Sequence, residues 1–152
     1  MTIREYDKSL KAILAEMMVS YMTELDCGIP EDIIRGKLSD HIDHLCEAGI
    51  IRVCMLFSGN DPAAFSVFQI DTLESDWCKR PGWGFIREYY VSPSHRKSGI
   101  GKMLADYTEQ ELRGMGAKNL YLTSTGAIPF WQKCGWHLTD ELCSNGQYIL
   151  EK

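Results

Sequence analysis

The segment that most constrains this chain is Arg96-Lys97-Ser98-Gly99-Ile100-Gly101. It follows a β-rich run at residues 85–91 and opens a stretch, residues 100–115, whose apolar side chains recur at helical spacing. The start of a helix leaves several backbone N–H groups without partners, and these groups bind anions. Gly99 and Gly101 carry no side chain that would keep a phosphate away from the backbone, while Arg96, Lys97 and Lys102 add positive charge. The segment therefore predicts a phosphate-binding corner between a strand and a helix.

Two common phosphate-binding motifs do not fit this corner. A Walker loop needs a glycine five positions before its Gly-Lys pair and a Ser or Thr after the pair. Arg96 and Met103 occupy those positions. The dinucleotide fingerprint needs a third glycine three residues after the second, where this chain has Leu104.

The rest of the chain shows alternating strand and helix signals. Apolar and β-branched runs predict strands at residues 2–6, 50–57, 63–70, 85–91, 120–123 and 148–150. Amphipathic periodicity predicts helices at residues 8–25, 30–48, 100–115 and 128–133. The strands at 85–91 and 120–123 are joined through a helix, so we expect them to be parallel. This order predicts an α/β fold with a mixed sheet, and 152 residues suit a single domain, 1–152.

A second block consists of Ser124 and the run Ala-Ile-Pro-Phe-Trp-Gln-Lys-Cys-Gly-Trp at residues 127–136. The first segment resembles the motif Arg/Gln-x-x-Gly-x-Gly/Ala of the GNAT acetyltransferase superfamily, placed after a strand and before a helix as in that family. The second block is similar to the family's Asn-x-x-Ala-x-x-Phe-Tyr-x-Lys-x-Gly-Phe. Together the two blocks cover residues 85–136. The resemblance implies the GNAT acyl-CoA N-acyltransferase fold, a central mixed β-sheet with helices on both faces.

The resemblance also implies that the chain binds acetyl-coenzyme A. Backbone groups of Tyr89 and Val91 would then hydrogen-bond the pantetheine arm, and amides from Arg96 to Gly101 would hold the pyrophosphate. The two parallel strands would diverge and admit the acetyl thioester. The expected cofactor-binding residues are Tyr89, Tyr90, Val91, Arg96, Lys97, Ser98, Gly99, Ile100, Gly101, Lys102, Ser124, Phe130 and Trp131.

An amine attacks a thioester only when it is neutral, so the site has to remove a proton from the ammonium. Glu88 is the candidate base, because GNAT members often carry an acidic residue near this point of the strand. Alternation places Glu88 and Tyr90 on the face opposite Arg87, Tyr89 and Val91. Pairing of Glu88 with an arginine, or simple exposure to solvent, is the alternative. If Arg87 faces the substrate instead, an acidic acceptor becomes possible.

The chain departs from the family at the tyrosine that usually protonates the leaving thiolate, because Trp131 stands there. Ser124, Thr125 or Tyr121 could supply a hydroxyl, the thiolate could leave without help, or the chain could be an inactive relative. We expect an N-acetyltransferase acting on the primary amine of a small molecule. Acetylation of a protein N-terminus or lysine is an alternative, and so is a non-catalytic acyl-CoA-binding sensor.

Composition and charge indicate which classes of partner and which location to expect. The net charge of −5 disfavours a protein that neutralises nucleic-acid phosphates. Six cysteines without a C-x-x-C pair, no apolar signal sequence and no long apolar run indicate a reduced, cytoplasmic protein without membrane contact. His41, His44 and Cys46 lack the spacing of a metal site, so no metal is expected. Trp77 and Trp83 could cover the acceptor or pack beneath a loop, and a homodimer is possible by analogy alone.

Overall fold

A computed structural model describes residues 1–75 and 79–152. The strands are β1 (Thr2–Glu5), β2 (Arg52–Ser58), β3 (Asp61–Ile70), β4 (Gly84–Val91), β5 (Leu120–Ser124), β6 (His137–Leu142) and β7 (Tyr148–Glu151). The α-helices are α1 (Lys11–Glu24), α2 (Glu31–Ile33), α3 (Ser39–Glu47), α4 (Ile100–Gly114) and α5 (Ile128–Lys133). Two 3-10 helices, η1 (Lys8–Leu10) and η3 (Pro93–His95), and a π-helical segment, η2 (Ile34–Leu38), complete the elements.

The strands form one mixed sheet in the order β1-β2-β3-β4-β5-β7-β6. β4 and β5 are parallel, with Gly84 opposite Leu120 and Ile86 opposite Leu122, which confirms the prediction from the intervening helix. β1 pairs antiparallel with β2, and β7 pairs antiparallel with both β5 and β6. The predicted α/β fold with a mixed sheet is therefore confirmed.

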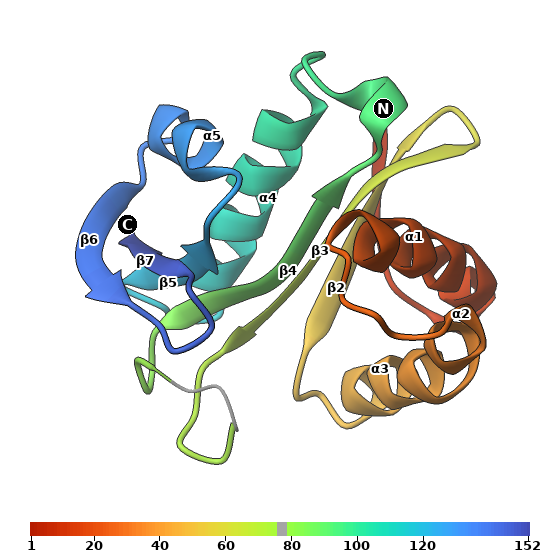
Figure 1. Cartoon of the computed structure of the whole chain (residues 1–152), viewed down its shortest axis with the longest axis horizontal. Coiled ribbons are helices and arrows are strands. Elements are labelled where there is room, and N and C mark those ends of the chain that lie inside the picture. Colours follow the sequence, from red (N-terminus) through yellow and green to blue (C-terminus); the bar gives the residue numbers. More distant parts are fainter. Residues whose placement is uncertain (76–78) are drawn as a thin grey trace. The chain divides into compact units, whose positions relative to one another are not determined.

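The internal contacts of the chain group into two compact units, and β3, β4 and α4 each contribute residues to both. The first unit comprises Met1–Val67 and Glu88–Leu104. Its helices α1 and α3 lie side by side (Figure 1). The apolar stripe predicted for α1 forms the core of this unit with β2, β3 and the end of β4, through the buried side chains of Leu14, Met17, Met18, Val53, Met55, Phe57, Phe65, Val67 and Tyr90.

The helix expected at residues 30–48 is continuous in the structure but not uniform. α2, η2 and α3 follow one another without a break from Glu31 to Glu47, with the π-helical turn in the middle. Ile34 at the start of this turn is 1% exposed, so the wider turn still carries an apolar side chain into the core. Apolar periodicity identifies a helix here but does not report a local change in its winding.

The second unit comprises Phe68–Arg87 and Ala105–Lys152. Its small core contains Phe85, Tyr121 and Ile149, and the rings of Phe85 and Tyr121 stack with their centroids 4.5 Å apart. β6 was not predicted from the sequence, because its residues lie mainly at the surface and give no alternating apolar pattern.

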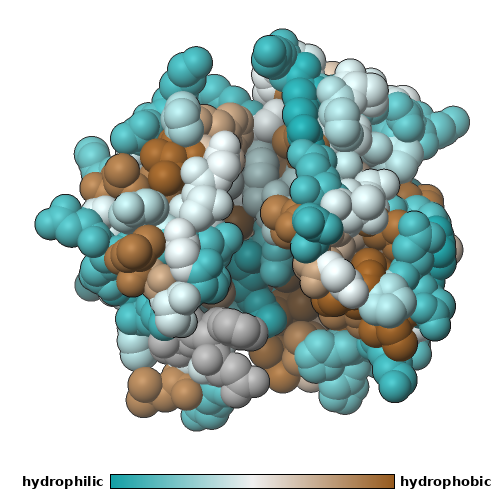
Figure 2. Space-filling view, viewed as in Figure 1, coloured by the Kyte–Doolittle hydropathy of each residue, from teal (hydrophilic) through white to brown (hydrophobic). Residues whose placement is uncertain are grey.

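Over α1 to α3, hydrophobic residues reach the surface in patches between hydrophilic ones (Figure 2). Exposed members of this region are Ile13, Leu25, Ile29 and Ile50. In the described part of the chain, no helix combines the length and the apolar character that crossing a bilayer requires.

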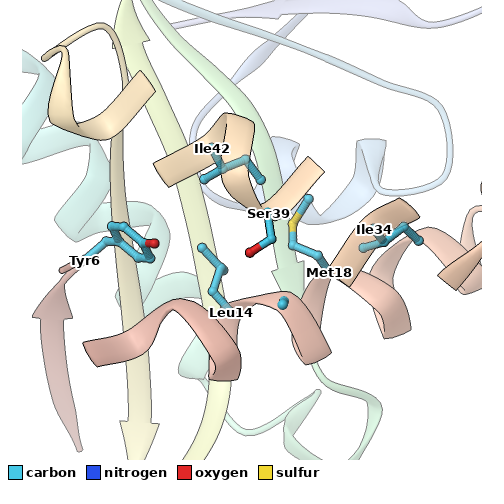
Figure 3. A pocket seen from close by; sticks show the side chains of 7 residues that line it. Tyr6, Leu14, Met18, Ile34, Ser39 and Ile42 are labelled. Atoms are coloured by element: carbon cyan, nitrogen blue, oxygen red, sulfur yellow. The ribbon is translucent and has the colours of Figure 1, made fainter. Parts of the chain in front are cut away.

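A small space lies inside the first unit between α1 and α3. Figure 3 shows Leu14 and Met18 of α1 directed toward Ser39 and Ile42 of α3. The space leaves no room for a water molecule. It is a gap in the packing and not a binding site.

Candidate active site

The C-terminal half of β4 presents two sets of side chains in the first unit. Glu88 and Tyr90 meet Tyr21 of α1: the Tyr21 hydroxyl donates a hydrogen bond to Glu88 Oε2, and the rings of Tyr21 and Tyr90 lie 5.5 Å apart. The hydroxyl of Tyr89 instead donates to the backbone carbonyl of Gly101 in the first turn of α4. These contacts follow the alternation that the sequence predicts for this strand.

The backbone N–H and C=O groups at this end of β4 also alternate between the two edges of the strand. The Ser92 amide donates to the Ala63 carbonyl at 2.8 Å. The backbone groups of every second residue before Ser92 therefore face β3. In an antiparallel pair the residues between them direct their N–H and C=O groups to the opposite edge, so Tyr89 and Val91 face away from β3. This is the edge at which the family resemblance places the pantetheine arm.

The loop after β4 turns sharply before α4 begins. Lys97 and Gly99 both have positive φ, of 60° and 86°. Glycine adopts this left-handed region without strain, whereas a side chain at residue 99 would be strained there. The Gly99 carbonyl accepts the Met103 amide at 3.1 Å, so α4 starts directly after this glycine.

Amides in the first turn of α4 have no acceptor within the helix. A Cβ atom added at Gly99 would meet no other atom within 4 Å, so the backbone at this point is open to an approaching group. Lys97 and Lys102 are exposed. The corner therefore offers what a diphosphate requires: donors at a helix N-terminus, positive charge and an unobstructed backbone.

Side-chain contacts within and beside this loop stabilise it. The Ser98 hydroxyl donates to the His95 carbonyl, and His95 contacts Ser92 Oγ at 2.7 Å and Asp61 Oδ2 at 3.1 Å. These contacts tie the loop to the end of β4 and the start of β3. A preorganised anion site loses less conformational entropy on binding.

The side chain of Arg96 does not extend along this loop. Its guanidinium pairs with Glu24 at the end of α1 at 2.8 Å, donates to the Val91 carbonyl at 2.9 Å, and lies over the Tyr90 ring, 5.7 Å from its centroid. The charge expected from Arg96 is thus directed to the end of α1, and its contribution to the corner is through the backbone.

Glu88 is half-buried and accepts the hydrogen bond of Tyr21. Burial and the charge of Glu88 raise the pKa of Tyr21 above its ordinary value. Tyr21 therefore remains a hydrogen-bond donor at neutral pH. In the sequence, Tyr21 is one member of the apolar periodicity of the helix predicted at residues 8–25, and that pattern gives no sign of a role in the site.

Arg87 lies on the other face of β4, in the second unit. Its Nη1 donates to Gln69 Oε1 of β3 at 2.8 Å. This contact gives the guanidinium a partner within the sheet and so does not require an acidic acceptor.

The second sequence block lies in the second unit, on β5 and α5. Ser124 ends β5, is buried, and its Oγ accepts the Ala127 amide at 3.3 Å. Trp131 of α5 is 4% exposed and makes edge-to-face contacts with Phe130 and Trp136, at centroid distances of 5.0 and 5.5 Å. At the position of the family's tyrosine the chain thus has an indole packed among aromatic rings.

Tyr121, one of the alternative hydroxyls, is fully buried in the core of the second unit. Its hydroxyl donates to Asp71 Oδ2 and its ring stacks on Phe85. These contacts explain Tyr121 as a structural residue that anchors the segment after β3. Thr125 is exposed in the turn after β5.

The remaining candidates from the sequence fall elsewhere. Within residues 1–75 and 79–152, no three His, Cys, Asp or Glu side chains are grouped so that they could hold a metal ion, and His41 and His44 are exposed. Trp83 lies against Tyr121, with the Arg80 guanidinium 5.4 Å from its ring centroid. Trp77 lies outside the described residues.

An open groove of about 510 Å³ runs along α1 beside the end of β4. Tyr90 and Ser92 form one side, and α1 with the start of β3 forms the other through Ala12, Ile13, Glu16, Met17, Ser20 and Pro62. Tyr90 in the groove wall also contacts the ring of Tyr21, whose hydroxyl donates to Glu88.

Comparisons with known proteins agree with this geometry. Residues 18–136 match the model of the Acetyltransferase (GNAT) family. The Bacillus subtilis (strain 168) protein "Uncharacterized N-acetyltransferase YjcF" is 30% identical over 66 residues, which cover 43% of this chain and 47% of that protein. The match therefore spans about half the length of this curated relative.

Solved structures share the fold at low sequence identity. An aminoglycoside 6'-N-acetyltransferase complexed with coenzyme A has a TM-score of 0.76 at 15% identity, covering 100% of this chain and 96% of that one. A predicted acetyltransferase from Clostridium acetobutylicum with acetyl-CoA has a TM-score of 0.75 at 19% identity, covering 94% of each chain. The PaiA N-acetyltransferase of Thermoplasma acidophilum in complex with coenzyme A has a TM-score of 0.70 at 18% identity, covering 100% and 99%. With the matched family model, the open glycine corner before α4 and the acidic residue on β4 lead to one conclusion: this chain belongs to the GNAT acetyltransferase family.

Proposed function

We propose that this protein binds acetyl-coenzyme A and transfers the acetyl group to the primary amine of a small molecule, with residues 1–152 acting as one functional domain. The observation that carries the proposal is the position of Glu88. It is a half-buried carboxylate one residue from Tyr89, whose side chain is hydrogen-bonded to the first turn of α4. A candidate base and the candidate phosphate corner are thus joined through one strand.

Binding of the cofactor rests on the backbone of the corner. Amides from Arg96 to Gly101 hold the pyrophosphate, with Lys97 and Lys102 adding charge. Hydrogen bonds to a charged group contribute about 1.5–3 kcal/mol each. The backbone groups of Tyr89 and Val91 bind the pantetheine arm, and Ser124, Phe130 and Trp131 complete the cofactor site. The cofactor supplies an acetyl thioester that an amine attacks directly.

Glu88 acts on the acceptor. An alkyl ammonium has a pKa of about 10.4, so deprotonation at pH 7 costs about 4–5 kcal/mol. Glu88 removes this proton, directly or through a water molecule, and the neutral nitrogen then attacks the thioester carbonyl and forms the new N–C bond. A backbone amide near Val91 stabilises the oxyanion.

Collapse of the tetrahedral intermediate breaks the C–S bond and releases a thiolate, and the second proton of the attacking nitrogen passes to the thiolate or to solvent. The indole of Trp131 is not an acid, and the Tyr121 hydroxyl is bonded to Asp71. A cysteine-type thiol has a pKa of about 8.5, well below that of an alcohol, so a thiolate can leave without a protein acid. The proton taken by Glu88 returns to solvent after the thiolate departs.

The small-amine acceptor is supported by charge and by the relatives. The net charge of −5 favours a cationic partner. Two proteins of the same fold are aminoglycoside 6'-N-acetyltransferases. Acetylation of a protein N-terminus or lysine is the alternative within the family.

A second candidate function is a non-catalytic acyl-CoA sensor, and the packed Trp131 in place of a tyrosine favours it. Thiol release separates the two functions. Acetyl-CoA stabilises either protein against heat, by about 2.7 kcal/mol at a concentration 100 times Kd. Only the enzyme releases free thiol when a panel of polyamines, amino sugars and amino acid amides is added.

Glu88→Gln tests the base. We expect kcat to fall roughly 100-fold or more, because general base catalysis contributes at least that factor, while the Kd for coenzyme A measured by calorimetry stays unchanged. Glu5→Gln is the control, because Glu5 lies on β1, where it pairs with Arg52. A Glu88→Gln enzyme with wild-type turnover between pH 6 and 8 would exclude Glu88 as the base.

A further inference from the structure

Tyr21 is the residue of α1 that reaches the candidate base. Its hydroxyl donates to Glu88 Oε2, across 67 positions in the sequence. The same hydroxyl is also engaged by the backbone amide of Tyr89. The hydroxyl oxygen of Tyr21 therefore lies between the carboxylate of Glu88 and the strand edge at which the cofactor arm is expected.

The ring of Tyr21 is held on two sides. It meets Phe65 of β3 edge-on at a centroid distance of 5.6 Å and Tyr90 of β4 at 5.5 Å, and Phe65 and Tyr90 lie 5.8 Å from each other. Aromatic contacts of this kind fix the ring orientation. The hydroxyl cannot move away from Glu88 without disturbing the core of the first unit.

The direction of hydrogen bonding is also determined. Burial and the charge of Glu88 raise the pKa of Tyr21, so the phenol stays protonated across the pH range in which an acetyltransferase works. A neutral phenol beside a carboxylate donates its only proton. The Oε2 atom of Glu88 is thereby held by the Tyr21 hydroxyl.

We propose that Tyr21 is a positioning residue for the transfer reaction, which orients Glu88 and stabilises its ionised form so that the carboxylate is ready to accept the proton of the amine. This inference rests on the function proposed above, and it adds a residue from α1 to a site otherwise built from β4 and the loop before α4.

Other ionisable groups of the first unit lie close to Tyr21 and Tyr90. Glu24 on α1 and Arg96 pair with each other at 2.8 Å, so their charges largely offset at this position. Cys27 follows α1 and interacts with Tyr21. Tyr90 lies on the same face of β4 as Glu88, and Phe65 of β3, which contacts Tyr90, carries no ionisable group. Tyr21 is the group whose direct hydrogen bond to Glu88 is seen, so its removal has the clearest effect on the carboxylate.

Tyr21→Phe tests the proposal, because it keeps the ring contacts and removes the hydroxyl. Without its donor the carboxylate is less stabilised in the ionised form and protonates more readily. We expect the acid limb of the kcat/KM profile to move to higher pH and kcat to fall roughly tenfold through loss of orientation. The Kd for coenzyme A stays unchanged.

Tyr6→Phe is the matched control. Tyr6 also donates to a carboxylate, Asp43 Oδ1 at 2.8 Å, in the same unit but between β1 and α3. Loss of that bond affects stability and leaves the pH profile in place. NMR titration of the Glu88 carboxyl carbon in the protein without substrate gives an independent readout, and its midpoint should rise in Tyr21→Phe and not in Tyr6→Phe.

The outcomes separate this inference from the function on which it rests. If Glu88→Gln retains full turnover, the base assignment and the role of Tyr21 both fail. If Glu88→Gln is slow while Tyr21→Phe keeps the wild-type pH profile and the wild-type NMR midpoint, Tyr21 is only a packing residue and this inference alone is overturned.

Discussion

Cys27 and Cys46 lie in the first unit in very different surroundings. Cys27 is exposed in the turn after α1. Cys46 is half-buried on α3, where burial, followed by the charge of Asp43, raises its pKa to about 11. A raised pKa keeps the thiol protonated, and the thiolate is the reactive form.

We therefore expect iodoacetamide at pH 8 to modify Cys27 well before Cys46, whose thiolate fraction is about one in a thousand at that pH. Mass spectrometry of peptides from the native protein measures both rates. Unfolding in urea should bring the two rates close together. Equal rates in the native protein would contradict the buried environment of Cys46.

At this scale, the sequence predicts which way side chains point better than what they touch. Alternation along residues 85–91 correctly separated Glu88 and Tyr90 from Tyr89. It could not identify Tyr21 as the partner of Glu88, because that contact joins a helix and a strand 67 positions apart. The only available signal was one hydroxyl within an otherwise apolar stripe, which packing explains equally well.

Among the elements, α4 begins after a loop that requires an unusual backbone conformation. Gly99 has a φ of 86° with open space around it, so its importance is conformational and not a matter of close packing. Gly114, at the other end of α4, also has open space, but its φ is not positive. The two glycines therefore form a natural comparison.

Gly99→Ala is expected to strain the loop by about 1–2 kcal/mol. Part of that strain appears as weaker binding, roughly a tenfold rise in the Kd for coenzyme A, because the bound loop conformation becomes less favourable. Gly114→Ala should leave this Kd unchanged and leave stability equal or slightly higher. Calorimetric titration decides the matter, and equal affinities for both variants would exclude a special role for the loop conformation.

The sequence predicts the strongly periodic elements and misses the exposed one. α5 lies at residues 128–133 as expected, whereas β6, the hairpin partner of β7, is not predicted by the apolar pattern. Asn145-Gly146 in the turn was an available signal, because Asn-Gly favours a tight hairpin turn, and Gly146 has a φ of 85°. An edge strand in contact with solvent has no apolar pattern that would strengthen this signal.

For the molecule as a whole, several ionisable groups are protonated more strongly in the folded than in the unfolded chain. Burial raises the pKa values of Tyr6, Tyr21 and Cys46 above their ordinary values. Asp43 further raises that of Tyr6, and Glu88 that of Tyr21. The stability that these groups contribute is complete below their unfolded pKa values and is lost as the pH rises through the folded values.

The free energy of unfolding should accordingly decrease above about pH 9–10, where the unfolded thiols and phenols ionise and the folded ones do not. Urea unfolding at pH 8 and pH 10.5 measures the change. Tyr6→Phe should lose less stability between these pH values than the wild type. Tyr148→Phe, at an exposed position on β7, should lose as much as the wild type. An identical loss in all three proteins would contradict the role of Tyr6.

β4 passes through both compact units: its first four residues belong to the second unit and its last four to the first. A slip of this strand by one residue would exchange its two sets of side chains, since alternate residues point to opposite faces. Glu88 would then turn toward the start of α4, and Tyr89 would turn toward Tyr21. An insertion or deletion inside β4 would therefore misplace the proton acceptor and the cofactor anchor together.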